Sequence, residues 1–140
     1  MTRKYYGLRN EIDTEVLVLN GDEVHPLDPR LDLVNHSPTG LEWGYGGSGP
    51  AQLALALLCD ALEDDARAQD LYQDFKFRFV ANLPFNAWVA TRAEILEVVR
   101  EIETERRRHA TSRNAASRPD DLLDMEVEDR LSGGGEGVEE

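Results

Sequence analysis

The residues best suited to chemistry lie between positions 28 and 52, where a run of polar side chains leads into a glycine-rich bend. The stretch "GYGGSGP", residues 44–50, stands directly before the most apolar run of the chain. Backbone N–H groups at the start of a helix attract anions, and glycine lets a ligand approach the backbone closely. One hypothesis is therefore an anion-binding site at this bend. Its candidate ligand-binding residues are Arg30, His36, Trp43, Tyr45, Gly46, Gly47, Ser48, Gly49 and Gln52.

The same bend also has a purely structural interpretation. It lacks the GK[ST] ending of a phosphate loop, so no lysine is placed to reach a β- or γ-phosphate. Three of its glycines have the spacing G-x-G-x-x-G, but a loop rather than a strand precedes them, which makes a dinucleotide site weakly supported. The glycines would instead let the backbone pack under Trp43 and Tyr45 and start a helix, with Ser48 as the helix cap. The sequence leaves both interpretations open.

The polar residues before the bend allow two interpretations as well. Asp28, Arg30, Asp32, His36 and Glu42 could converge as an acid, a base and an anion clamp. They could also fix the loop, for example through a bidentate bond from Arg30 to a carboxylate. The second interpretation is favoured, because side-chain bonds to loop backbone are the usual means of ordering such loops.

The rest of the sequence shows no complete catalytic or metal-binding set. The three histidines, at positions 25, 36 and 109, lack the spacing of a zinc site. Cys59 stands in an apolar run and is predicted to be a small core residue. We therefore predict no metal and no cofactor, and the sequence leans against an enzyme.

The N-terminal part of the chain predicts a small antiparallel sheet. β-branched and aromatic residues cluster at 4–8, 15–19 and 23–27, and Asn20-Gly21 indicates a two-residue type I′ turn. Residues 28–49 show little periodicity and form a long loop, of a length that is often functional. The segment "NAWVAT" is predicted to be a short strand or an extended turn.

Three helices are predicted after the loop. The first covers about 50–62 and is apolar nearly all round, which is typical of a buried, central helix. The second begins at a cap on Asp64, and the chain leaves this helix by about residue 83. The third begins at the capping box of Thr91 and Glu94 and ends at about 110.

These elements predict an α+β fold: a small N-terminal antiparallel sheet of two or three strands packed on three helices, with the first helix central. A single domain over residues 1–110 is expected. Residues 111–140 are acidic and Gly-rich and are predicted to be a disordered tail. The apolar residues between Leu122 and Leu131 allow an alternative, in which this part is a docking peptide that orders on a partner.

The net charge of the chain limits which environments and partners are expected. The chain has 28 Asp and Glu against 15 Lys and Arg, a net charge of −13, and its two lysines are Lys4 and Lys76. Such a surface makes nucleic acid an unfavourable partner in spite of the basic stretch 106–113, and it argues against an anionic membrane. An acid excess with few lysines fits a salty cytoplasm, because salt screens the self-repulsion. No run reaches the roughly 20 apolar residues of a membrane span. We therefore expect a cytoplasmic protein, or one carried inside a virion assembled there.

The stretches "LDPRLDLVNHSPTGLEWGYGGSGPAQLALALL", "LYQDFK" and "NLPFNAW" together resemble a family of small proteins from bacteria, archaea and their viruses. It is catalogued as a domain of unknown function, family 6166. The resemblance covers about residues 4–105, and the matching segments are 27–30, 35–40 and 42–52. The family has no assigned activity, so no catalytic residue is transferred. The resemblance implies a phage or other mobile-element context, and it implies that the loop and the first helix act as one unit.

The leading functional hypothesis is a noncatalytic accessory or interaction module of a halophilic prokaryote, such as an archaeon, or of its virus. Another protein is its expected partner, and association with a second copy of the chain is allowed. One alternative is a small enzyme or ligand-binding protein that holds an anion at residues 44–50. The other is a structural component of a virion.

Overall fold

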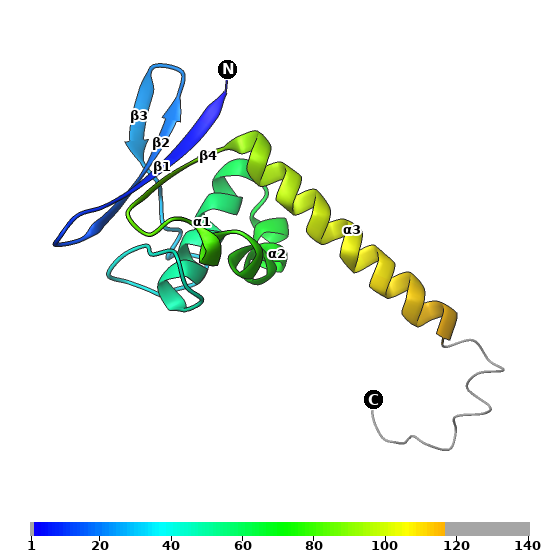
Figure 1. Cartoon of the computed structure of the whole chain (residues 1–140). Helices are drawn as coiled ribbons and strands as arrows, with labels where there is room; N and C mark the ends of the chain where they lie inside the picture. The colour runs from blue at the N-terminus through cyan, green and yellow to red at the C-terminus, as the bar shows by residue number, and fades with distance from the viewer. Residues whose placement is uncertain (1, 117–140) are drawn as a thin grey trace. The chain divides into compact units, whose positions relative to one another are not determined.

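The computed structural model describes residues 2–116, in which a sheet is formed mainly by the N-terminal part of the chain and three α-helices follow (Figure 1). Of the described residues, those up to Ile102 form one compact unit, and those from Glu103 to Ala116 belong to a second. The α+β class is confirmed. In chain order the elements are β1 (Arg3–Arg9), β2 (Thr14–Asn20), β3 (Glu23–Pro26), α1 (Ser48–Leu62), α2 (Asp65–Arg78), the 3-10 helix η1 (Val80–Asn82), β4 (Ala87–Thr91) and α3 (Arg92–Ala116).

The sheet is antiparallel, with the strand order β3-β2-β1-β4. Its fourth strand is β4, in the segment predicted to be a short strand or an extended turn. It pairs with β1 so that Gly7 lies opposite Trp88. A Cβ atom at Gly7 would come 2.1 Å from Nε1 of Trp88. The indole therefore lies directly against the glycine, where a larger residue would clash with it.

The hairpin between β2 and β3 turns one residue later than predicted. Asn20 pairs with Glu23, so the two turn residues are Gly21 and Asp22. Gly21 has a φ of 68°, and Asn20 remains in the strand. The predicted type I′ turn at Asn20-Gly21 is therefore wrong, and glycine at the first turn position is typical of a type II′ turn instead.

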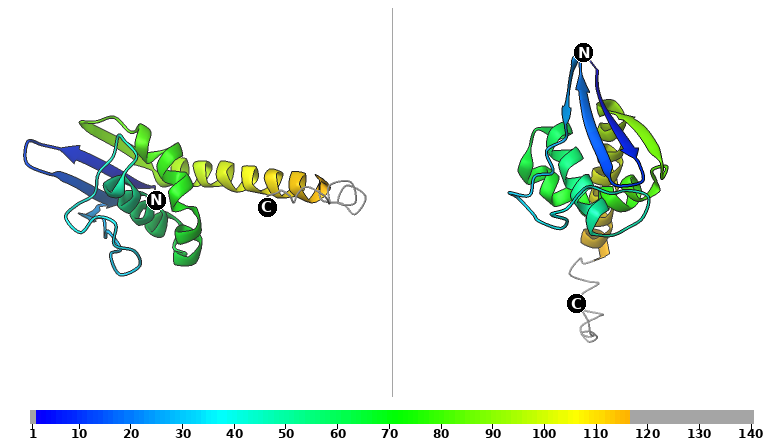
Figure 2. Two further views of the ribbon diagram at one scale, coloured as in Figure 1. Left: turned by 90° about the horizontal axis from the view of Figure 1, so that it is seen from below. Right: turned by 90° about the vertical axis from the view of Figure 1, so that its left-hand side faces the viewer.

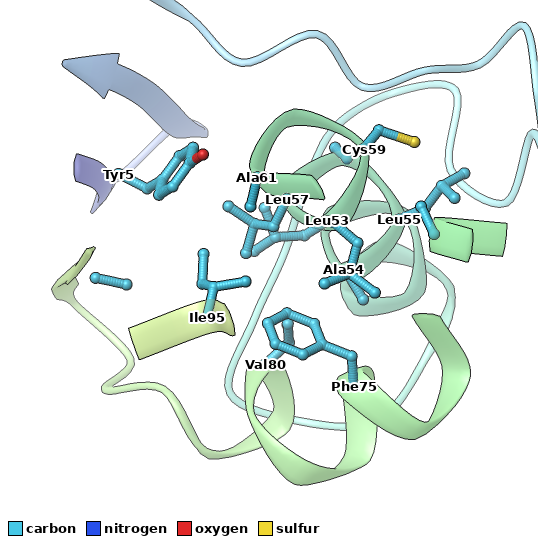
Figure 3. Packing of buried hydrophobic residues seen from close by; sticks show 14 of the residues in the cluster. Tyr5, Leu53, Ala54, Leu55, Leu57, Cys59, Ala61, Phe75, Val80 and Ile95 are labelled. Carbon is cyan, nitrogen blue, oxygen red and sulfur yellow. The ribbon is translucent and has the colours of Figure 1, made fainter. Parts of the chain in front are cut away.

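The core is built around α1, which is confirmed as the central helix. Every residue of α1 from Gly49 to Cys59 is buried, as its nearly uninterrupted apolar sequence requires. Figure 3 shows Tyr5 of β1, Phe75 of α2 and Ile95 of α3 approaching the leucines of this helix from different sides. A helix surrounded in this way fixes the positions of the loop and the strands that contact it.

Local capping signals place the starts of α2 and α3 as predicted. The Asp64 carboxylate accepts a hydrogen bond from the N–H of residue 67, and Thr91 and Glu94 exchange the two bonds of a capping box, 2.8 and 3.0 Å long. The helix ends differ from the prediction. The second helix ends at Arg78, and η1 carries the chain onward.

The third helix continues to Ala116, about six residues past its predicted end. The residues from 103 to 112 are largely exposed and charged, and Arg107 donates to Oγ1 of Thr104 one turn earlier. Hydrogen bonds within the helix need no apolar stripe, so a polar continuation of this kind carries little signal in the sequence. Residues 111–116, the start of the predicted disordered tail, therefore lie in this helix, and the rest of that tail, with its apolar segment at 122–131, lies outside the described residues.

Helices cover one face of the sheet, the inner face, to which Tyr5, Val16 and Val18 contribute buried side chains. The opposite face is here called the outer face, and no helix within the described residues up to Ile102 packs on it (Figure 2). Alternation along the strands gives this face a largely apolar surface. Its large apolar side chains are Tyr6, Leu8, Leu17, Leu19, Val24 and Val89.

Candidate functional site

The loop between β3 and α1, residues 27–47, holds most of the residues that the sequence proposed for ligand binding. It begins in the core, where the N–H of Leu27 donates to the carbonyl of Val16. Within it, the N–H groups of Leu33 and Val34 both donate to the carbonyl of Arg30, closing a turn. The loop therefore has a defined backbone, and its polar side chains have to be assigned one by one.

Gln52 of α1 pins the middle of this loop from inside the protein. Its side chain is fully buried, with an exposed fraction of 0%. Its Oε1 accepts hydrogen bonds from the N–H groups of His36 and Ser37, at 2.7 and 3.2 Å. Its Nε2 donates to the carbonyls of Pro29 and Val34, at 2.6 and 2.9 Å. Both polar atoms are thus satisfied by loop backbone, as a buried amide requires.

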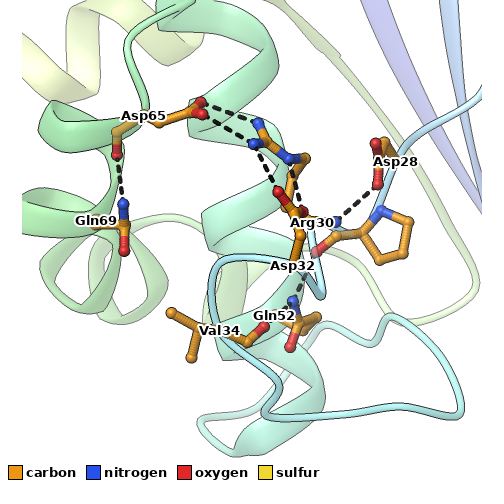
Figure 4. Close-up of polar contacts among 8 residues, drawn as sticks. Asp28, Arg30, Asp32, Val34, Gln52, Asp65 and Gln69 are labelled. Carbon is orange, nitrogen blue, oxygen red and sulfur yellow. Dashed lines mark hydrogen bonds and ion pairs between the residues drawn. The ribbon is translucent and has the colours of Figure 1, made fainter.

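Arg30 joins the loop to the start of α2 through a clamp of two carboxylates, which we call the Arg30 clamp (Figure 4). Its guanidinium donates to both oxygens of Asp65, at 2.9 and 2.8 Å, and to both oxygens of Asp32, at 3.1 Å each. These bonds lower the pKa of both carboxyl groups and raise the pKa of the guanidinium. Bidentate pairs of this kind fix orientation as well as distance.

The backbone of Arg30 is also unusual. Its φ is 56°, in the left-handed region that residues with a side chain seldom adopt. The carboxylate of Asp28 stabilises this turn by accepting the N–H of Arg30 at 2.9 Å. The local strain is therefore offset by hydrogen bonds, and it aims the guanidinium across 35 residues of sequence at Asp65.

His36 contacts α2 at a separate point. Its Nε2 lies 2.7 Å from the hydroxyl of Tyr72, and the two rings are 5.7 Å apart between centroids. Its backbone N–H is already bound by Gln52. His36 is therefore a second tie between the loop and the helices, outside the Arg30 clamp.

The end of the loop is tied to β1 by Arg9. Oε1 of Glu42 lies 2.7 Å from Nη2 of Arg9 as an ion pair, and Nη1 of Arg9 donates to Oε2 at 3.1 Å. The guanidinium also lies over the rings of Trp43 and Phe85, at 4.9 and 3.8 Å from their centroids. The Trp43 indole is fully buried and donates to the carbonyl of Phe85 at 2.9 Å. Trp43 is thus a core residue in this structure.

In the glycine-rich bend, side chains of neighbouring loop residues pack directly against the glycines. A Cβ atom at Gly47 would lie 2.9 Å from the ring of Tyr45, and one at Gly49 would lie 2.6 Å from Cβ of Glu42. Gly44 has a φ of 88° and donates its N–H to the carbonyl of Val80. Close packing and one positive φ therefore account for three of the glycines without a ligand.

The start of α1 has no side-chain cap and leaves backbone N–H groups without a partner in the described chain. The helix N-cap is Gly47, and no side chain caps it, so the prediction that Ser48 is the cap is wrong. Ser48 is instead the first residue of the helix. In the described chain the N–H groups of Gly46, Gly47, Ser48 and Gly49 donate no hydrogen bond to the protein, and Gly46 and Ser48 are exposed. These free N–H groups lie at the positive end of the helix dipole, where they could bind an anion.

The sequence model of a family of unknown function (DUF6166) matches residues 5–101, which is more than half of the chain. The chain belongs to this family. No curated protein and no solved structure matches it. The DUF6166 segment contains the whole loop, α1 and α2, so the contacts described above for the loop and the bend all lie inside it.

Of the residues proposed from the sequence of this DUF6166 domain, the structure brings together Arg30, His36 and Gln52 in one loop-holding network. Tyr45 and the residues from Gly46 to Ser48 surround the exposed start of α1. Asp28 and Asp32 converge on Arg30, whereas Glu42 pairs with Arg9 elsewhere. A common acid, base and anion clamp is therefore not formed by these side chains. Ligand binding at the bend stays a prediction.

A further cluster of the DUF6166 domain was missed by the sequence reasoning. A cavity of about 280 Å³ lies at the end of α1, between Arg30, Cys59 and Asp60. Asp60 accepts hydrogen bonds from Tyr5 at 2.6 Å and from Arg3 at 3.1 Å. Burial and the bond to Asp60 raise the pKa of Tyr5, and burial raises the pKa of Cys59 to about 11. The available signal was a lone carboxylate in an otherwise apolar helix run.

Two further features are absent from the described residues. In residues 2–116, no three His, Cys, Asp or Glu side chains come together as a metal-binding group. In the same part of the chain, none of the helices combines the length and hydrophobicity that crossing a membrane requires.

Proposed function

We propose that this DUF6166 domain is a noncatalytic interaction module that binds a protein through the outer face of its sheet. The carrying observation is that this face is apolar across all four strands. Leu8, Val24 and Val89 are 48%, 59% and 57% exposed, and Tyr6 lies between them on β1. An exposed apolar patch of this extent is typical of an interaction site in a folded domain.

The polar side chains of the loop support this proposal, because they bind other groups of the protein. The amide of Gln52 makes four bonds to loop backbone, and Arg30 is held by two carboxylates. A residue that binds substrate needs a donor or acceptor directed at the substrate, and these side chains direct theirs at the protein. The loop then acts as a brace that holds α1 and α2 in place, and α1 in turn supports the inner face of the sheet.

The net charge of the chain indicates the environment in which the module works. A net charge of −13 keeps the rest of the surface solvated, and salt screens its self-repulsion. We assign the protein to the cytoplasm of a halophilic prokaryote, or to its virus. An apolar recognition face suits this setting, because hydrophobic contacts persist at salt concentrations that weaken ionic ones.

Site-specific photocrosslinking tests the proposal. A photoreactive phenylalanine is placed at Val89, in the outer face, and in a matched variant at Ile12, which is 91% exposed in the turn between β1 and β2. In cells that express the full chain, we expect protein adducts from position 89 and none above background from position 12. Equal labelling at the two positions, or none at either, would contradict the proposal.

A second candidate function rests on the four amides from Gly46 to Gly49 that donate no bond to the described protein. They favour an anion at the start of α1, with Tyr45 beside it. A thermal-shift screen in high salt with inorganic phosphate and nucleotides tests it. A rise in Tm with phosphate that is lost in a Gly46→Pro variant, which removes one amide, would support an anion site. The absence of any shift across the panel would exclude it.

A further inference from the structure

The outer face carries two charges at opposite ends of its apolar surface. Lys4 lies on β1 opposite Leu19, and Glu15 lies on β2 opposite Leu8. Along the strands the two positions are four residues apart, which is about 14 Å at about 3.4 Å per residue. Between them lies the pair Tyr6 and Leu17, near the middle of the face.

This arrangement is complementary to itself. A two-fold axis that lies in the plane of the outer face, runs across the strands and passes near Tyr6 and Leu17 turns one end of the face onto the other. Lys4 of one copy then lies over the end of the sheet that carries Glu15 in the second copy. The same operation repeats the contact with the copies exchanged, as a two-fold interface requires.

We infer that the occupant of the outer face is a second copy of this chain, stacked sheet against sheet around such an axis. The inference rests on the proposed function, because it names the partner of the same face. Sheets packed face to face keep their strands within about 30° of each other at a separation of about 10 Å. In that geometry Tyr6 and Leu17 of each copy lie in the dry centre, with Val89 beside Tyr6 on the edge strand β4, and Lys4 and Glu15 lie at the two ends of the apolar surface.

The size of the face sets the strength of this dimer. Four strands about 4.8 Å apart, with about five paired residues each, cover roughly 19 by 17 Å. With the relief of the side chains, two copies together bury on the order of 1,000 Å², which is the lower end for a specific interface. The dimer is therefore weak and reversible. Because each copy carries a net charge of −13, it is also promoted by salt.

Sedimentation equilibrium of the full chain tests the inference. We expect a monomer–dimer equilibrium whose dimer fraction rises between about 0.1 M and 2 M salt, since screening removes the repulsion between copies. Val89→Lys places a charge beside Tyr6, within the apolar face, and should weaken dimerisation at least about tenfold. Ile12→Lys makes the same charge change on a residue outside the face and should leave dimerisation unchanged. Val24→Lys, on the edge strand β3, repeats the test if Val89→Lys does not fold.

A charge swap tests the axis itself at moderate salt. Lys4→Glu and Glu15→Lys should each weaken the dimer by roughly five- to tenfold, because each turns two attractive contacts into repulsive ones. The double variant restores the pairing with reversed sign and should return within about threefold of the wild type. Singles that weaken the dimer without rescue in the double variant would overturn this axis.

The outcomes separate this inference from the proposed function. A chain that stays monomeric at every salt concentration overturns the dimer, and so does a dimer that Val89→Lys and Val24→Lys leave intact. If the monomeric chain still forms adducts from position 89 with a different protein, the interaction module stands and its partner is that protein. If it forms none, both proposals fail.

Discussion

Replacing Gln52 is the sharpest test of how the loop is held. Gln52→Leu keeps a similar volume in the core but removes four hydrogen bonds to loop backbone. Each such bond contributes about 1 kcal/mol net, and a backbone group left buried without a partner costs about 1–3 kcal/mol. Part of the loop is exposed, so water can reach some of the released groups. We therefore expect the free energy of unfolding to fall by about 3 kcal/mol, a large share of the stability of a small domain.

The isosteric change Gln52→Glu adds a pH dependence with a definite sign. Protonated, the new carboxyl has one O–H donor and retains three of the four bonds. In the wild type, Nε2 of Gln52 donates to the carbonyls of Pro29 and Val34 at 2.6 and 2.9 Å. The ionised carboxylate of the variant would place a negative charge next to these two carbonyl oxygens. Its pKa in the folded state is therefore raised above the unfolded value of about 4.3. Relative to the wild type, the variant should be most stable near pH 4 and lose stability as the pH rises through the raised pKa.

Urea unfolding at pH 4.5 and pH 7 measures both effects, and hydrogen exchange of the amides of His36 and Ser37 reports the loop directly. Gln69→Leu, on an exposed position of α2, is the matched control and should change stability by less than about 0.5 kcal/mol. A loss below about 1 kcal/mol in Gln52→Leu, with the two amides still protected, would show that the loop is held by something other than this side chain.

Three further predictions follow from the contacts described above. The Arg30 clamp lowers the pKa of its two carboxyl groups, so its stabilisation is present above their unfolded pKa and is lost as the pH falls through the folded values. Arg30→Met should therefore flatten the acid side of the stability curve in urea unfolding, and an unchanged curve would contradict the clamp. Burial raises the pKa of Cys59 from 9.0 to about 11, so its thiolate near pH 8 is about 100-fold scarcer than that of a free thiol. A disulfide reagent should label it slowly in the native protein and readily in urea, whereas rapid native labelling would count against its burial. Gly7→Ala forces the Trp88 indole to move and should cost about 1–3 kcal/mol in thermal unfolding, with a change in tryptophan fluorescence. Wild-type stability in that variant would mean that the indole does not lie on the glycine.

The features that could be predicted from the sequence are those set by neighbouring residues. The caps at Asp64 and Thr91 depend on residues three positions away, and both were placed correctly. The central position of α1 followed from its composition alone. The hairpin was also local, but its turn is one residue off, because pairing of Asn20 with Glu23 takes the asparagine into the strand. Turn propensity gives no information about that cross-strand pair.

The features that could not be predicted depend on partners far along the chain. Arg30 was expected to bind a carboxylate, but nothing in its neighbourhood identifies Asp65, 35 residues later. The same holds for β4, whose place in the sheet depends on Trp88 meeting Gly7. Gln52 and Asp60 are instructive in another way. Each is a polar residue within an apolar helix, and each proves to bind groups outside that helix. Such isolated polar residues mark where a buried helix meets the rest of the fold.

The charges around the start of α1 bear on what the bend can do. This helix has no acidic residue in its first turn, yet its positive end favours a negative charge. Glu42 places its side chain against Gly49, and Arg9 holds the Glu42 carboxylate in an ion pair at 2.7 Å. The protein thus brings an anion of its own close to the helix start. An external anion would have to approach the exposed amides of Gly46 and Ser48 past this carboxylate and through the field of a strongly acidic surface. Apolar contacts at the outer face need no incoming anion, and salt, which screens the repulsion between acidic proteins, strengthens binding there. High salt therefore weakens an ionic site at the bend and favours the outer face, the proposed site of recognition.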